Sequence, residues 1–473
     1  MSFAKRVAAG STQLMLSSVA TRLLSLITMP ILTALLSPSA YGVAAMVATL
    51  ISLAGVIALA GMDVSYVRSY QSGAYVDAEA VEAFCWRFAL FSGIGIGLLV
   101  LVQWHVLAEV FELPAYLVVF VLIGIVASVA NAMSLARARL GNRYGTISIA
   151  GFAAALITAV CSIAIAYYWR RDELALVVGT LLTSLIPIIW LGVPSLSKLI
   201  RSSGLSRAQR SQVFNVGIAA VLSAPAYWLM SSSDRWFLAY FNDATTVGVY
   251  AVSYTIAVMG LMVNNAVLPA WTTEAVREVE SGQESGPAVL GKVAERFIAV
   301  LLVVWLAVAA AGGDIVELLA APEFHVARVI VPFIALAVFF HGIIHIASGV
   351  FIVTNKLQKT IVWWVLAGVL CVLSNVVLIP LFGIVGAALS QVLGFGFAAV
   401  GLMLASAKVY PLQIDWRRLV LFAIVVGGCG ILMSPPWSEV PLMSLLIKLL
   451  PGLAVVLIGI RLFIPNISEL VRG

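Results

Sequence analysis

Charged residues are scarce in this chain of 473 residues: only 10% are charged, whereas 62% are hydrophobic and the mean hydropathy is +1.10. Soluble domains carry about 25% charged and roughly 45–50% apolar residues. A water-soluble fold of this length could not hide this much apolar surface from water. Lipid must therefore be part of the solvent of this protein. Lipid-exposed backbone must be hydrogen-bonded within its own segment, and the apolar runs reach about 20 residues, the length of a spanning helix. The sequence therefore predicts an all-α integral membrane protein.

Cysteine is also rare, and its four copies all lie inside apolar runs, at Cys85, Cys161, Cys371 and Cys429. Their spacing excludes a disulfide framework and does not fit metal ligation, so we interpret them as small buried side chains. The chain contains no Walker-type phosphate loop, so we do not expect ATP to drive it directly. The sequence predicts no cofactor and no metal. It also predicts no nucleic-acid partner, because the net charge of +6 comes from residues that flank the apolar segments.

Fourteen apolar segments of about spanning length follow one another, with twelve as the alternative count. They are 13–36, 43–66, 84–107, 115–136, 146–168, 174–196, 214–239, 248–271, 296–319, 328–352, 360–380, 383–407, 417–433 and 441–464. The first is longer than a signal-peptide core of roughly 7–15 residues, so we expect it to be a spanning helix. Alternate loops, counted from the N-terminus, contain 21 of the 27 Lys and Arg residues, and the opposite loops contain three. The positive-inside rule then predicts a cytoplasmic N-terminus.

Two stretches of the sequence indicate an internal repeat. LLSPSAYGVAAMVATLIS surrounds Gly42 and YFNDATTVGVYAVSYTIA surrounds Gly248, 206 residues later. Each places a polar turn and a Gly-Val pair at the entry of a helix. Six predicted helices separate the two, an even number, so the halves are expected to be parallel repeats related by an axis along the membrane normal. The longest connection, 272–295, lies midway, where a cytoplasmic linker is expected.

Arg22 is the clearest candidate functional residue, because it lies about nine residues inside the first segment. An ionisable group costs at least about 2.5–3.5 kcal/mol at the centre of a spanning helix, so its presence needs a reason. Arg22 is either a structural partner of a neighbouring helix or a fixed cation that faces a cavity and awaits an anionic substrate group. Asp234 and Arg235 lie near the outer end of the seventh segment. Adjacent residues on a helix point to different sides, so we expect each to have its own partner.

Four further candidates lie in or beside spanning segments. Asp63 and Arg68 close the second segment at the inner face, where Arg68 is either a cytoplasmic rim charge or a ligand. His341 and His345 share one face of the tenth segment, and a protonatable cavity site and ordinary hydrogen bonding between helices are both open. A metal site is not expected, since no carboxylate or Cys completes the ligand set. For Lys448 in the last segment, snorkelling toward the interface is the expected behaviour.

Several motifs occur in the order and spacing of a known family. Leu35, Leu36, Pro38, Tyr41 and Gly42 match its first hairpin turn, and Gly61, Asp63, Arg68 and Tyr70 match the end of its second helix. Asp234–Arg235 followed by Val247–Tyr250 matches the start of its second half, and Ile379–Pro380 with Gly383, Gly386, Ala387 and Ala388 matches a late hairpin. On these motifs, residues 10–410 resemble the polysaccharide-biosynthesis flippases (Wzx-like) of the multidrug/oligosaccharidyl-lipid/polysaccharide (MOP) exporter superfamily.

The resemblance implies two six-helix bundles around a central cavity, at 1–205 and 206–410, with two added helices at 411–473. It implies alternating access that moves a polyprenyl-diphosphate-linked oligosaccharide from the cytoplasmic to the periplasmic leaflet of a bacterial inner membrane, without enzymatic activity. Substrate-binding candidates in the cavity are then Arg22, Asp63, Arg68, Asp234, Arg235, His341 and His345. The implied partners are the lipid-linked oligosaccharide and membrane lipid, with a polysaccharide polymerase and chain-length proteins as candidates.

Three alternatives stay open at this point. A drug or cation antiporter of the same superfamily would need an intramembrane carboxylate, and Asp63, Asp234 and Asp314 all lie near segment ends. A lipid II flippase would be expected to have more arginines in its first helices. A membrane-embedded glycan polymerase or ligase would need a large outer loop, and the outer loops of this chain are short.

Overall fold

The computed structural model describes residues 3–71, 78–200, 204–221, 224–281, 286–354 and 356–463. It is 89% helical, and the described residues contain no strand. Thirteen described segments are long and apolar enough to cross a bilayer. The predicted fold class, an all-α multi-pass membrane protein, is confirmed.

The chain packs as two compact units, residues 1–248 and 249–473. The helices of unit 1 are α1 (Phe3–Leu35), α2 (Pro38–Leu59), α3 (Met62–Gln71), α4 (Ala78–Phe111), α5 (Leu117–Leu140), α6 (Tyr144–Tyr168), α7 (Leu174–Leu191), α8 (Leu196–Ile200), α9 (Arg207–Val221), α10 (Ala224–Phe241) and the first residues of α11 (Ala244–Ala257). Unit 2 continues with η1 (Val258–Gly260), α12 (Leu261–Ser281), α13 (Gly286–Leu319), η2 (Pro322–Ile330), α14 (Val331–Val353), η3 (Leu357–Thr360), α15 (Ile361–Phe382), α16 (Ile384–Ala407), α17 (Trp416–Met433) and α18 (Pro441–Phe463). The predicted domain boundaries at 205 and 410 remain a prediction.

Thirteen of the fourteen predicted segments coincide with a candidate span, and the seventh, 214–239, does not. Its described residues form two helices, α9 and α10, on either side of residues 222–223, which lie outside the described part. α9 has only 15 residues, and α10 contains the polar run from Ser231 to Arg235. Both helices therefore fall short of the length or hydropathy of a continuous apolar span.

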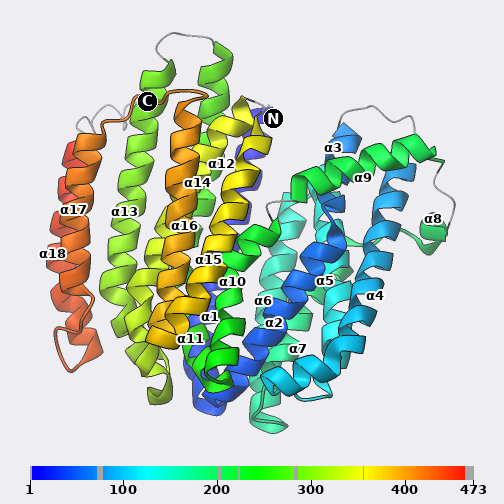
Figure 1. The fold of residues 1–473 in the computed structure, drawn as a ribbon, viewed down its shortest axis with the longest axis horizontal. Helices are drawn as coiled ribbons and strands as arrows, with labels where there is room; N and C mark the ends of the chain where they lie inside the picture. Colours follow the sequence, from blue (N-terminus) through cyan, green and yellow to red (C-terminus); the bar gives the residue numbers. More distant parts are fainter. Residues whose placement is uncertain are drawn as a thin grey trace. The chain divides into compact units, whose positions relative to one another are not determined.

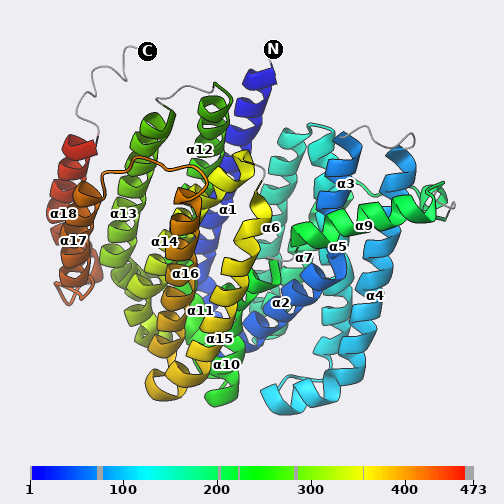
Figure 2. The ribbon, with the colours of Figure 1, turned by 45° about the horizontal axis from the view of Figure 1, so that its top comes forward.

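The second predicted segment, 43–66, breaks into α2 and α3 at Ala60 and Gly61, whose φ angles are +46° and +70°. α9 packs on this break, and Figures 1 and 2 both show it running across α3, α4 and α5. A Cβ on Gly61 would lie 2.1 Å from the carbonyl oxygen of Gly217 in α9, so only glycine permits this approach. The Ser65 hydroxyl also donates to the carbonyl of Val213 in α9.

The most extensive contacts within each unit join a small set of helices. In unit 1, α1 packs along α6, and α6 along α7. In unit 2, α15 and α16 form a hairpin against α14, and α17 and α18 pack on α13 (Figure 1). α4 and α13 each contain 34 residues and stand at matching places in the order of helices. Their first residues lie 208 positions apart in the sequence, and so do their last residues. The matching order supports the repeat inferred from the sequence.

Candidate functional site

Arg22 lies on a polar strip of α1. Ser18, Arg22 and Ser25 follow one another at helical spacing and share one face. Leu23 and Ile27, on the roughly opposite face, are 52% and 67% exposed within the chain. The apolar face suits contact with lipid, and the polar strip suits contact with water or a polar ligand. Among the described side chains, none forms an ion pair with Arg22, which is partly exposed.

Asp234 and Arg235 are buried in α10 and pair with one another. Arg235 Nη1 lies 3.5 Å from Asp234 Oδ1 and also donates to the carbonyl of Ser231 at 3.1 Å. Asp234 and Arg235 are only 1% and 8% exposed. Backbone periodicity did not indicate this contact between neighbours, and that each residue also has its own partner elsewhere stays a prediction. The long Arg235 side chain folds back along its own helix and so reaches both acceptors.

Two tryptophans dock α10 on α2 through a single threonine. Trp228 Nε1 donates to the carbonyl of Thr49 at 3.2 Å, and Trp236 Nε1 donates to the Thr49 hydroxyl at 2.9 Å. That hydroxyl in turn donates to the carbonyl of Met46 at 2.8 Å. The two indoles lie eight residues apart on one face of α10, so this helix is held at two points.

Asp63 and Arg68 occupy α3 without pairing with each other among the described residues. Asp63 is partly buried in the first turn and Arg68 is exposed in the last. A different charge pair lies at this end of unit 1: Arg137 Nε in α5, on a partly exposed side chain, lies 3.1 Å from Oε1 of the buried Glu82 in α4. The sequence does not single out Glu82, because a lone Glu at the start of an apolar run resembles an ordinary flanking charge.

His341 and His345 come together on α14, as their spacing predicts. Their ring centroids are 4.3 Å apart at an interplanar angle of 71°, and Phe395 of α16 lies 5.6 Å from His341. His341 is buried and His345 partly so. No group of three His, Cys, Asp or Glu residues that could hold a metal occurs in the described part of the chain.

The seven candidates are divided between the two units. Arg22, Asp63, Arg68 and the Asp234–Arg235 pair belong to unit 1, and the two histidines belong to unit 2. Within the described part of unit 1, no ion pair joins Arg22, Asp63 or Arg68 to the Asp234–Arg235 pair. Among the described contacts, those between candidates join Asp234 with Arg235 and His341 with His345.

Gly42 and Gly248, the two glycines of the sequence repeat, meet at a close helix crossing within unit 1. A Cβ on Gly42 would lie 1.7 Å from the carbonyl oxygen of Ala244, and a Cβ on Gly248 would lie 1.7 Å from that of Pro38. Each contact falls four residues before the partner glycine, so the crossing is reciprocal. The caps repeat as well: Ser37 accepts from the Ala40 amide, and Asp243 accepts from the Thr246 amide.

Lys448 does not snorkel. Its Nζ lies 2.6 Å from Asp314 Oδ2, and the two residues are 3% and 2% exposed. The expectation of an interfacial lysine was therefore wrong, because a partner 134 residues away in the sequence draws the ammonium group into the interior of unit 2.

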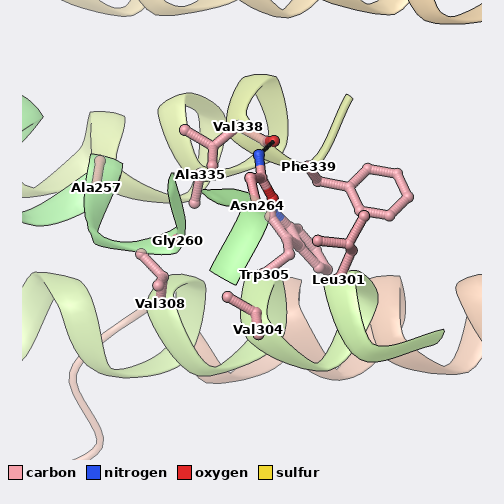
Figure 3. Close-up of a pocket in the computed structure, with 10 residues that line it drawn as sticks. All are labelled: Ala257, Gly260, Asn264, Leu301, Val304, Trp305, Val308, Ala335, Val338 and Phe339. Atoms are coloured by element: carbon pink, nitrogen blue, oxygen red, sulfur yellow. Dashed lines mark hydrogen bonds between the residues drawn. The ribbon is translucent and has the colours of Figure 1, made fainter. Parts of the chain in front are cut away.

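Among the described residues of unit 2, a small cavity and an apolar groove differ in character. A cavity of about 10 Å³, which has room for roughly one water molecule, lies beside η1, between α11 and α12 (Figure 3). Asn264 borders this cavity, and its Nδ2 donates to the Val338 carbonyl at 2.9 Å. An apolar groove of about 400 Å³ lies among α13, α14, α16 and α17, with Phe340 and Trp416 in its lining. The cavity is too small for a substrate, and the groove suits only an apolar chain.

Comparison with known proteins agrees with this arrangement. A family model described as "Polysaccharide biosynthesis protein" matches residues 31–310, more than half of the chain. No match was found among curated protein sequences.

Solved structures share the fold at low sequence identity. The inward closed conformation of the lipid II flippase MurJ superposes with a TM-score of 0.72 at 12% identity, over 96% of this chain and 99% of that one. An inward-facing multidrug resistance MATE family transporter of the MOP superfamily has a TM-score of 0.58 at 16% identity, over 82% of this chain and 94% of that one. A Vibrio cholerae MATE transporter has a TM-score of 0.59 at 14% identity, over 86% of this chain and 96% of that one. The fold is that of MOP-superfamily flippases and transporters, and the expected resemblance is confirmed.

Proposed function

This chain belongs to the polysaccharide biosynthesis protein family, and from that premise we propose that it is a flippase for lipid-linked oligosaccharides. It moves polyprenyl-diphosphate-linked repeat units from the cytoplasmic to the periplasmic leaflet of a bacterial inner membrane, for the assembly of surface polysaccharide. Its N-terminus lies in the cytoplasm, since 21 of 27 basic residues fall in the loops on that side.

The observation that carries this proposal is the polar strip of α1. A diphosphate carries several negative charges, and a guanidinium group recognises phosphate oxygens with paired, charge-assisted hydrogen bonds. Arg22 supplies such a cation at membrane depth, partly exposed and flanked by the hydroxyl groups of Ser18 and Ser25. Hydroxyl groups on the same strip can bind further phosphate or sugar oxygens. Asp63, Arg68, Asp234, Arg235, His341 and His345 remain candidates for contacts with the sugar units.

Alternating access is supported by the repeat. Two N-capped helices that cross through glycines at equivalent positions form a packed contact on the proposed outer side of unit 1. Parallel repeats of this kind are known in transporters that work by alternating access.

The surroundings of the three carboxylates weigh against an antiporter. An antiporter needs an intramembrane carboxylate that can exchange its ion, whereas Asp234 is paired with Arg235, Asp314 is paired with Lys448, and Asp63 lies near the end of its predicted segment. The proposed activity involves no covalent chemistry, so the protein is a transporter and not an enzyme. Lipid II is a second lipid-linked diphosphate that the same cation would bind, and the experiment below separates the two substrates. A polymerase and chain-length proteins are the proposed downstream partners.

Deletion of the gene in its native host, followed by leaflet assignment of the accumulated lipid-linked oligosaccharide, tests the proposal. We expect accumulation on the cytoplasmic face and loss of surface polysaccharide. Arrested growth with accumulated lipid II would indicate the peptidoglycan precursor as substrate. Normal surface polysaccharide with increased sensitivity to cationic drugs would refute the flippase and favour an exporter.

A further inference from the structure

The hairpin of α17 and α18 meets the rest of unit 2 mainly along α13 (Figure 1). At the C-terminal end of α13, Lys448 donates from Nζ to Asp314 Oδ2 at 2.6 Å and to the Ala310 carbonyl at 2.9 Å. The Ser444 hydroxyl donates to the same carboxylate oxygen at 3.0 Å and accepts from the Trp437 amide at 2.9 Å. Asp314, Ser444 and Lys448 are all at least 97% buried.

These three side chains form a satisfied polar cluster in apolar surroundings. An isolated carboxylate or ammonium group at membrane depth is strongly unfavourable, so each ion depends on the presence of the other. The hydroxyl and the backbone carbonyl supply the additional hydrogen bonds that a buried ion pair requires. Since the ions come from α13 and α18, their pairing defines one register between the two helices.

A second attachment lies at the other end of α13. Arg296 Nε donates to the carbonyl of Phe463 at 3.3 Å, and the Gln413 amide donates to the carbonyl of Pro287 at 3.1 Å. A Cβ on Gly291 would lie 2.1 Å from the Gln413 carbonyl oxygen, so the connecting segment touches the α13 backbone there. The 18 residues from Arg296 to Asp314 span about 27 Å of helix, close to the hydrocarbon thickness of about 30 Å.

The surface between the two attachments is closely packed on α17. A Cβ on Gly430 would lie 2.6 Å from the indole ring of Trp305 in α13, and that indole is itself oriented by donation to the Pro332 carbonyl at 3.0 Å. Phe422 of α17 packs on Phe463 of α18 with ring centroids 5.4 Å apart. The hairpin therefore contacts α13 along the length of the membrane-spanning part.

We propose that Asp314, Ser444 and Lys448 form a buried lock that fixes the α17–α18 hairpin to α13 in one register, so that the hairpin is a rigid extension of unit 2. The lock would hold unit 2 together whatever substrate the protein transports.

Hydrogen exchange measured by mass spectrometry on the purified full-length protein in lipid nanodiscs tests the lock. The variants are Lys448→Met, Asp314→Asn and the double variant that removes both charges. Lys408→Met is the matched control, because Lys408 is exposed and lies just before the hairpin. In each single variant we expect amide exchange in 416–463 to accelerate at least about tenfold, with no change in 117–191 of unit 1. The control should exchange like the unmodified protein.

The double variant distinguishes a lock from two independent contacts. Because it leaves no unpaired buried charge, its exchange in 416–463 should be slower than in either single variant. If the single variants fail to accumulate as folded protein, recovery of folded protein in the double variant supports the lock. Single variants that exchange like the unmodified protein overturn it. So does a double variant whose effect equals the product of the single effects, or one that fails to fold along with the single variants.

Discussion

Substitution of Gly42 by alanine tests the reciprocal crossing of α2 and α11 in the most direct way. The added Cβ would lie 1.7 Å from the Ala244 carbonyl oxygen, and contacts of a Cβ closer than 3.0 Å are essentially never seen. The helices must therefore separate by at least 3.0 − 1.7 = 1.3 Å at this point. Since the obstructing atom belongs to the backbone, no rotamer change relieves the clash, and overpacking of this kind typically costs about 1–3 kcal/mol.

Gly95→Ala is the matched control, because Gly95 lies within α4 and has no atom within 4 Å of its added Cβ. Both substitutions gain the same helix propensity, about 0.8–1 kcal/mol. The difference between their free energies of unfolding, measured by reversible denaturation in mixed micelles, isolates the crossing. We expect Gly42→Ala to be less stable than Gly95→Ala by about 1–3 kcal/mol.

The reciprocal geometry makes a second, sharper prediction. Gly248→Ala should resemble Gly42→Ala, because its Cβ meets the Pro38 carbonyl oxygen at the same 1.7 Å. Once one methyl group has parted the helices, the second has less to displace, so the double variant should lose at least about 0.5 kcal/mol less than the sum of the two single losses. Strictly additive losses, or a Gly42→Ala variant as stable as Gly95→Ala, would refute the reasoning.

Three further outcomes are expected. In the deletion strain, Arg22→Ala should fail to restore surface polysaccharide although the protein still inserts normally. Arg22→Lys should keep part of the activity because the charge remains. Full activity of the alanine variant would exclude the cation as a substrate contact. Thr49→Val removes the acceptor of Trp236 and should lower the free energy of unfolding by about 1–3 kcal/mol, whereas Trp236→Phe in the Thr49→Val background should add less than it does alone. Asp415→Ala removes the side chain that accepts from the Arg418 amide at the start of α17 and should destabilise by about 0.5–2 kcal/mol in the same assay, with Asp415→Asn close to the unmodified protein.

Local properties of the sequence determined the fold class and most of the spans. An apolar run of about 20 residues must become a helix wherever it meets lipid, because its backbone has no other hydrogen-bond partners. Thirteen of the fourteen predicted segments accordingly coincide with candidate spans. The Gly42–Gly248 repeat was also visible, since the polar turn and the Gly-Val pair lie within a few residues of one another.

Tertiary structure alone decided how the charges are paired. The partner of Lys448 lies 134 residues away, and that of Glu82 lies on another helix, so no local pattern could indicate either. The Arg235 side chain reaches back along its own helix to Ser231 and Asp234, a contact that backbone periodicity did not indicate. The contact of α9 with the break at Gly61 likewise depends on packing between distant segments. Solvation by lipid acts on each segment separately and can be predicted from the sequence, whereas the partner of a buried charge is determined by the helices that pack around it.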